Sequence, residues 1–348
     1  MSATSKLTVN VANPANNLIF ARVTAAERDA HFDANNPPTI GMVIFNDDDK
    51  VLEFWNGTEW KVALGERTGG GGGRTVYDFQ SFSFEESSSA NYLGPDTNYV
   101  VQRINGNDGW KSNSSYLSVN QGTWDWTVPS TGNFKIECWG AQGGRSNCYG
   151  PAGGQGAYAT GVIRLTGGDQ LKIIVGRMGQ GNCYDCGGGG FTAITNENYQ
   201  AIVVAGGGGG GSASGMNGPG PFHGHANETG GGTAWANGGG PNQGGNGAGG
   251  PPGGGGGITG NGGGPWGGQS FQSGAQGGGN QARGGFGGGG GGGGTNGAGG
   301  GGGYGGGASS RWSFYGAGGG SFVDPEATSI QKQASQKSGG GKIVITKQ

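Results

Sequence analysis

The chain has 348 residues, of which 92 are glycine, and its formal net charge at pH 7 is -2. This balance of charge gives no general attraction to nucleic acid or to an acidic membrane surface, because both need a basic excess. Glycine occurs in blocks and there are only 13 prolines, which excludes the repeat of a collagen triple helix. No segment has the apolar core of a signal peptide or the length of a membrane span, so we expect synthesis in a cytoplasm and no membrane insertion.

Changes in composition divide the chain into parts of different chemistry. Glycine is scarce at the start, dominates a long central segment, and gives way again near the end. Glycine runs form flexible linkers, so the first such run, TGGGGGR at residues 68–74, predicts a hinge. We expect residues 1–67 to form an N-terminal domain, 68–75 a glycine-rich hinge, 76–205 a β-sandwich, 206–310 an inserted glycine segment, and 311–348 the return to the sandwich.

The N-terminal domain is predicted to be small and to mix one helix with strands. Thr24 and Glu27 have the spacing of a capping box, which predicts a short helix that begins there. Residues 40–64 alternate apolar blocks with turn formers and predict a three-stranded meander. Its clearest hairpin signal is the pair Asn56-Gly57.

Closely spaced strands are predicted from residue 76 to residue 205. In the stretch TWDWTVP, Trp124, Trp126 and Val128 fall on one face of a strand and polar residues on the other, which is typical of a half-buried strand. Repeated short strands of this kind favour an all-β sandwich. Residues 342–346 again read as a strand, and because a lone strand is not stable we expect it to join the same sandwich.

Two structures are compatible with the glycine segment 206–310. Low-complexity glycine commonly forms a disordered linker. Alternatively, extended chains with three residues per turn have backbone groups that point sideways, and without Cβ atoms such chains can pair laterally. The second structure would be a polyglycine-II helix bundle held by the strands at its two ends. Ile258 is the only large aliphatic residue of the segment, so we expect no hydrophobic core from it.

The sequence gives no support for catalysis, a cofactor or a metal. Matches to GxGxxG follow from the glycine content alone, and Lys342 lacks the Ser or Thr that a phosphate loop places after its lysine. His223 and His225 could clip a metal, but an exposed polar loop explains them better. The cysteines leave three alternatives open, namely disulfides formed in an oxidising exterior, zinc, and free buried thiols. The candidate disulfide residues are Cys138, Cys148, Cys183 and Cys186.

Side chains gathered in the loops that join the glycine runs are the candidate recognition residues, because the interiors of the runs have no side chains with which to discriminate a ligand. Trp235 and Trp266 lie where no aliphatic core is expected, so they either wedge the bundle or form a platform for a ligand. Aromatic rings stack on sugars and are enriched among binding hot spots. The candidate receptor contacts are Phe222, His223, His225, Trp235, Asn237, Trp266, Phe271 and Trp312.

The region from residue 116 to the C-terminus resembles a known glycine-rich module. The stretches GTWDWTVPSTGNFKIECWGAQGG, GGQGAYATGVIRLTGGDQLKIIVGRMGQ, GGGGFTAIT, AIVVAGGGGG, GGGSFVD and GGGKIVITKQ carry the resemblance. They are similar to the module in the ectodomain of the anaplastic lymphoma kinase receptor family and in phage and bacterial surface proteins. The resemblance implies a mainly β fold, in which a jelly-roll-like (TNF-like) sandwich carries an inserted polyglycine-II bundle. It does not extend to a kinase or to signalling.

Residues 35–63, NNPPTIGMVIFNDDDKVLEFWNGTEWKVA, resemble a segment of phage tail-fibre and appendage proteins. Together the resemblances imply a virion appendage assembled in the host cytoplasm and exposed on the particle exterior. The N-terminal domain would bind other virion proteins, and the glycine-rich tip would bind a host glycan or outer-membrane protein. Fibre proteins of this kind are usually homotrimers. The alternatives are a capsid or neck decoration without a receptor, and ice binding, which the irregular glycine blocks disfavour.

Overall fold

The computed structural model describes most of the chain as two compact units. The two units are Met1–Arg74 and Thr75–Gln348. The predicted hinge at 68–75 lies outside the described residues. Those residues are 21–32, 36–48, 51–64, 76–87, 91–106, 109–148, 152–211, 222–279, 281–294, 297–312 and 314–348, with the side chains of 62–64 left out.

The N-terminal unit contains one helix and a four-stranded sheet. The sheet has the order β1-β2-β3-β4, in which β1 runs parallel to β2 and the other pairs are antiparallel. The predicted meander is therefore confirmed. Its elements are β1 (Arg22–Val23), α1 (Ala25–His31), β2 (Val43–Asn46), β3 (Val51–Trp55) and β4 (Trp60–Leu64).

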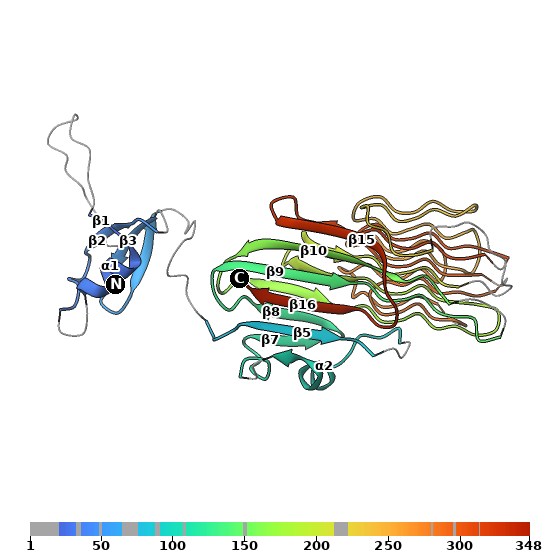
Figure 1. Cartoon of the computed structure of the whole chain (residues 1–348), viewed down its shortest axis with the longest axis horizontal. Helices are drawn as coiled ribbons and strands as arrows, with labels where there is room; N and C mark the ends of the chain where they lie inside the picture. The colour runs from blue at the N-terminus through green and yellow to red at the C-terminus, as the bar shows by residue number, and fades with distance from the viewer. Residues whose placement is uncertain are drawn as a thin grey trace, which may run out of the picture. The chain divides into compact units, whose positions relative to one another are not determined.

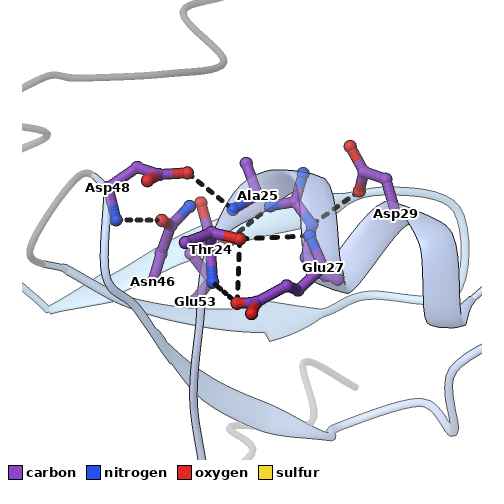
Figure 2. A network of polar contacts seen from close by, with 8 residues as sticks. Thr24, Ala25, Glu27, Asp29, Asn46, Asp48 and Glu53 are labelled. Carbon is purple, nitrogen blue, oxygen red and sulfur yellow. Dashed lines mark hydrogen bonds and ion pairs between the residues drawn. The ribbon is translucent and has the colours of Figure 1, made fainter.

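Local side-chain hydrogen bonds begin the helix and close the hairpin. The backbone N–H of Glu27 donates to Thr24, and the backbone N–H of Thr24 donates to Glu27, so the capping box is confirmed (Figure 2). The hairpin at Asn56 is a four-residue loop rather than a two-residue turn. The Asn56 carboxamide accepts the backbone N–H groups of Thr58 and Glu59, which stabilises the longer loop.

The second unit contains two six-stranded sheets, so the chain is mainly β and sandwich-like, as expected (Figure 1). One sheet has the order β15-β10-β9-β16-β5-β6 and the other β14-β13-β12-β11-β8-β7. The strands of the first sheet are β5 (Ser81–Glu85), β6 (Asn105–Gly106), β9 (Gly132–Trp139), β10 (Gly156–Leu165), β15 (Thr328–Lys337) and β16 (Lys342–Lys347). The strands of the second are β7 (Leu117–Asn120), β8 (Thr123–Thr127), β11 (Gln170–Ile174), β12 (Thr192–Asn196), β13 (Ala201–Ala205) and β14 (Phe322–Val323).

The main hydrophobic core contains residues from both sheets. Trp124 and Trp126 are fully buried in it, together with Val128, as the alternation in TWDWTVP predicts. Phe82 and Phe84 of β5 contribute from the other sheet, and their rings lie 5.8 Å from Trp126 and 4.8 Å from Trp124 respectively. The sandwich is therefore held by a contiguous aromatic core, the largest favourable contribution available to a β fold of this kind.

The last strand of the chain returns to the sandwich. β16 pairs antiparallel with β9 on one side and with β5 on the other, so it is central in its sheet. Along the chain, the glycine segment therefore lies between strands of the same unit, β13 before it and β16 after it. The helix α2 (Thr97–Arg103) and the polar edge strand β15 were not expected. None of the helices in the described ranges has the length and apolarity needed to cross a bilayer.

Candidate functional site in the glycine-rich module

The glycine-rich runs continue from the ends of the strands and extend beyond one end of the two sheets (Figure 1). They are not confined to the predicted 206–310, since runs elsewhere in the second unit take part in the same hydrogen bonding. We use the name glycine-rich module for residues 140–148, 176–190, 206–211, 222–279, 281–294, 297–312 and 314–321.

Backbone hydrogen bonds in the module repeat with a period of three residues. In the run 299–304, the N–H of Gly299 donates to the carbonyl of Cys186, and the N–H of Gly302 donates to that of Gly189. A step of three residues along the donor run therefore matches a step of three along the acceptor run. The same step appears in two further sets of bonds. They are Gly300 to Gly253 with Gly303 to Gly256, and Gly301 to Ala317 with Tyr304 to Gly320.

Consecutive residues of this run therefore donate to three different neighbouring runs. A β-strand, in contrast, alternates between at most two neighbours. Further runs donate to the same segment, through the N–H groups of Gly207, Gly210 and Gly290. The run is thus surrounded by other runs, and its backbone polar groups are satisfied without any side chain.

Most glycines of the module have no room for a side chain. A Cβ atom added at Gly300 would come within 3.0 Å of backbone atoms of Gly307 and Ala308, a separation that real Cβ atoms do not show. Gly240 is a contrasting case, because a Cβ atom there would meet nothing within 4 Å. The close spacing of the runs thus requires glycine at interior positions and tolerates other residues at the surface.

A second hydrophobic core joins the module to the sandwich, contrary to our expectation that none would form. Ile174 and Val204, on the outer face of their sheet, are fully buried. The glycine segment supplies the residues that cover them, chiefly Ile258, Phe271 and Phe286. A few large side chains are enough because the sheet provides the rest of the apolar surface.

Phe271 is therefore a core residue and not a receptor contact. Its side chain is 1% exposed, and its ring contacts those of Phe191 and Tyr199 at 6.3 and 5.4 Å. A ring in this position stabilises the attachment of the module and presents no surface to a ligand. The continuous apolar runs in β11 and β13 were a signal of this second core, since burial on both faces removes the usual alternation.

Phe222 and His223 lie on the flank of the module, next to the sandwich. The ring of Phe222 stacks on that of Tyr315 at 4.7 Å. His223 Nδ1 accepts the backbone N–H of Gln155 at 3.0 Å and lies 3.2 Å from the Ser335 hydroxyl. These contacts give His223 a structural role, because its acceptor nitrogen anchors the module to the sandwich.

The pKa of His223 is lowered from its ordinary value of 6.5, chiefly by burial and also by the neighbouring His225. Below about pH 6.5, His223 therefore binds a proton more readily in the unfolded chain than in the folded chain. The free energy of unfolding consequently decreases as the pH is lowered. We expect the melting temperature to drop between about pH 7.5 and about pH 5, and to drop less in His223→Gln. His31→Gln, at an exposed site of the N-terminal unit, is the control. An equal drop in His223→Gln would contradict this role.

A buried ion pair attaches a loop of the sandwich unit to the module. Arg177 Nε lies 3.0 Å from Glu86 Oε1, and both side chains are almost fully buried. The Tyr99 hydroxyl donates to the other Glu86 oxygen at 2.8 Å, and Arg177 also donates to the carbonyl of Leu93 at 3.1 Å. Sequence reasoning missed this network, because its members are far apart in the chain and no local pattern joins them.

The cysteines follow two of the three alternatives. Cys148 and Cys183 form a disulfide with Cα atoms 4.8 Å apart, whereas Cys138 and Cys186 are free and buried. Burial raises the pKa of the Cys186 thiol to about 12, so this thiol stays protonated and unreactive at neutral pH. Within the described ranges, no group of three or more His, Cys, Asp or Glu side chains is arranged to hold a metal ion.

Trp312 lies at the end of the module that is remote from the sandwich. β13 ends at Ala205, and the next residues pair first with Gly302 and then, three residues on, with Gly299. In the run 297–304, residues with lower numbers therefore lie farther from the strands. Ser310 donates to Ala298, which is farther still, and Trp312 follows it with a side chain that is 58% exposed.

Trp235 and Trp312 form an aromatic cluster at this remote end. Their ring centroids are 5.9 Å apart with the rings nearly perpendicular, and Phe314 lies 4.7 Å from Trp235. Trp235 also lines an open groove of about 570 Å³, and the groove's walls carry mostly polar atoms. The lining residues are Thr233, Ala234, Trp235, Ala236, Asn237, Asn246, Gly247, Gly263 and Gly264.

The remaining candidate residues lie outside this cluster. The ring of Trp266 packs against Gly293, where an added Cβ atom would come within 3.0 Å of it, so this tryptophan fits the wedge role. The ring of His225 packs against Gly231, where an added Cβ atom would likewise come within 3.0 Å of the ring. The structure therefore brings together Trp235, Asn237 and Trp312, and adds Phe314, Thr233 and Asn246, which sequence reasoning did not name.

One comparison with known proteins identifies the N-terminal region. Residues 2–76 match a family model described as a phage tail like trimerisation region, and this range nearly coincides with the first compact unit. The chain matches no curated protein sequence. The match supports a phage tail-type structural protein, a virion component and a homotrimer.

Proposed function

We propose that this phage tail-type protein is a homotrimeric virion appendage that contacts the host surface through the remote end of its glycine-rich module. Residues 1–74 would assemble the trimer and bind other virion proteins, and the second unit would point outward from the particle. The proposal is one of binding and not of catalysis. The observation that carries it is the aromatic cluster of half-buried Trp235 and exposed Trp312 beside a polar groove.

The same proposal includes a polyglycine-II bundle inserted in a jelly-roll-like sandwich. The period of three residues in the lateral hydrogen bonds supports the bundle, since extended chains of the polyproline-II type have three residues per turn. A bundle of this kind is stiff because its runs are bonded on all sides. It would hold the aromatic cluster at a fixed distance from the sandwich.

The groove has the chemistry of a site for a host glycan or for a loop of an outer-membrane protein. Tryptophan rings stack on the apolar faces of sugars or serve as hot spots for a protein partner. Asn237 and Asn246 offer amide donors and acceptors for hydroxyl groups or backbone. Periodate treatment and protease treatment of host cells distinguish these two ligands.

Replacing Trp235 and Trp312 by alanine tests the proposal. Each lost ring should cost about 2 kcal/mol of binding free energy, which is about 30-fold in affinity, so particles carrying the variant should adsorb poorly to host cells. Tyr184→Ala is the matched control, because Tyr184 is 59% exposed and does not line the groove. Normal adsorption by a folded double variant would overturn the host-binding role.

One observation favours a second function, a decoration that stiffens the particle without a receptor. Phe271, Phe286 and Tyr304 are buried against the sandwich, so much of the aromatic content of the module serves its own packing. In that case the double variant would adsorb normally. Adsorption of the tryptophan double variant to host cells therefore distinguishes the two functions.

A further inference from the structure

The two faces of the N-terminal sheet have different surroundings. Side chains on neighbouring strands alternate between the faces, and one face carries Ile44, Asn46, Val51 and Glu53, all of which are buried. α1 lies over this face (Figure 2). Arg28 of the helix donates to Glu53 at 2.6 Å, and the Glu53 side chain is fully buried.

The opposite face carries Val43 and Phe45 from β2 and Leu52 and Phe54 from β3. They form two cross-strand pairs, Val43 with Phe54 and Phe45 with Leu52. All four are apolar and remain partly exposed. We call these residues the apolar face.

In the described part of the unit, no helix or strand covers the apolar face. α1 is the unit's one described helix and occupies the other side, while β1 to β4 form the sheet itself. A sheet with one apolar face left in water is not a stable layer, because domains bury such faces against a second layer. A unit this small is also marginal alone, since a short chain buries too little surface.

We propose that the apolar face is the contact between copies of this chain in the trimer. The inference rests on the proposed homotrimer and goes beyond it by assigning the face. The family match supplies the occupant, since residues 2–76 match a trimerisation region and contain all four residues. Three copies related by a threefold axis can direct these faces toward one another and close a shared apolar core.

The charges around the face agree with such an interface. Arg22 lies at its margin, where its guanidinium is 4.9 Å from the centre of the Phe45 ring and pairs with Asp47. Lys61 lies opposite Phe54 in the register and is exposed. An apolar centre with charges at the rim is typical of protein interfaces.

Placing a charge in the apolar face tests this assignment in the full-length protein. Phe54→Asp should convert the trimer to a monomer, with an apparent dissociation constant raised about 100-fold or more, because three carboxylates would be buried together. Ala26→Asp puts the same charge on an exposed position of α1 and should remain trimeric. Light scattering after size-exclusion chromatography measures the mass. A trimeric Phe54→Asp variant would overturn the assignment.

A cross-linking experiment keeps the test valid if Phe54→Asp does not fold. Leu52→Cys should form covalent oligomers with a short bis-maleimide, whereas Ala26→Cys and the parent chain should not. The native cysteines give little background, since two form a disulfide and two are buried. Equal cross-linking at both positions, or none at Leu52→Cys, would contradict the assignment.

The outcomes separate this inference from the proposed function. A monomeric parent chain would overturn the homotrimer and the assigned face together. A trimeric parent chain with an insensitive apolar face would overturn only the face. Host adsorption depends on the remote aromatic cluster and is measured independently with the tryptophan variants.

Discussion

Replacing Gly290 by valine should destroy the glycine-rich module. A Cβ atom at this position would come within 3.0 Å of backbone atoms of Gly253 and Gly254, and valine adds two further methyl groups. The run could then no longer keep the hydrogen bonds from Gly290 to Gly300 and from Gly188 to Gly290. Backbone cannot move aside as a flexible side chain does, so we expect a loss of about 4 kcal/mol or more.

Thermal melting followed by circular dichroism measures this loss. Gly240→Ala is the matched control, because it adds a Cβ atom in the same segment where nothing lies within 4 Å, and it should melt as the parent does. Gly290→Ala should be intermediate in effect, since it has the clash without the extra methyl groups. Parent-like melting of Gly290→Val would refute the tight lateral packing and the polyglycine-II assignment.

Deleting Met1–Arg67 should abolish incorporation into particles. The deletion removes nearly all of the region that matches the trimerisation model, while the second unit keeps both sheets and its hydrophobic cores. We therefore expect a soluble, folded monomer that is absent from purified virions. Loss of the trimer alone would weaken attachment strongly, because three linked contacts become one.

Immunoblots of purified particles and light scattering of the free protein test this result together. Full-length chain with Trp235→Ala serves as the control and should be incorporated normally, since Trp235 lies in the other unit. Incorporation of the truncated chain would show that the second unit attaches to the virion. The orientation proposed above would then be reversed.

Much of the sandwich could be predicted because its signals are local. The alternation in TWDWTVP follows from side chains that point to opposite faces of a strand, and the structure buries Trp124 and Trp126 accordingly. The capping box at Thr24 joins residues three positions apart, so it can also be recognised from the sequence alone. The return of the final strand followed from the instability of an isolated strand.

The candidate site was predicted only in part, because exposure depends on partners that are distant in the chain. The sequence singled out Phe271 and Trp312 by the same criterion, an aromatic residue in a cluster of side chains that joins glycine runs. The fold buries Phe271 against Phe191 and leaves Trp312 58% exposed. Similarly, Arg177 and Glu86 look like ordinary surface residues until the fold buries them as a pair.

The sequence by itself determined the two kinds of chain in this protein, strands with alternating apolar residues and runs without side chains. Only the tertiary structure decided which runs are neighbours, which cysteines pair and which aromatic residues reach the surface. The physical reason is that a glycine run carries no side chain to specify its partner. Its position follows from the strands that hold its ends and from backbone hydrogen bonds made across the whole module.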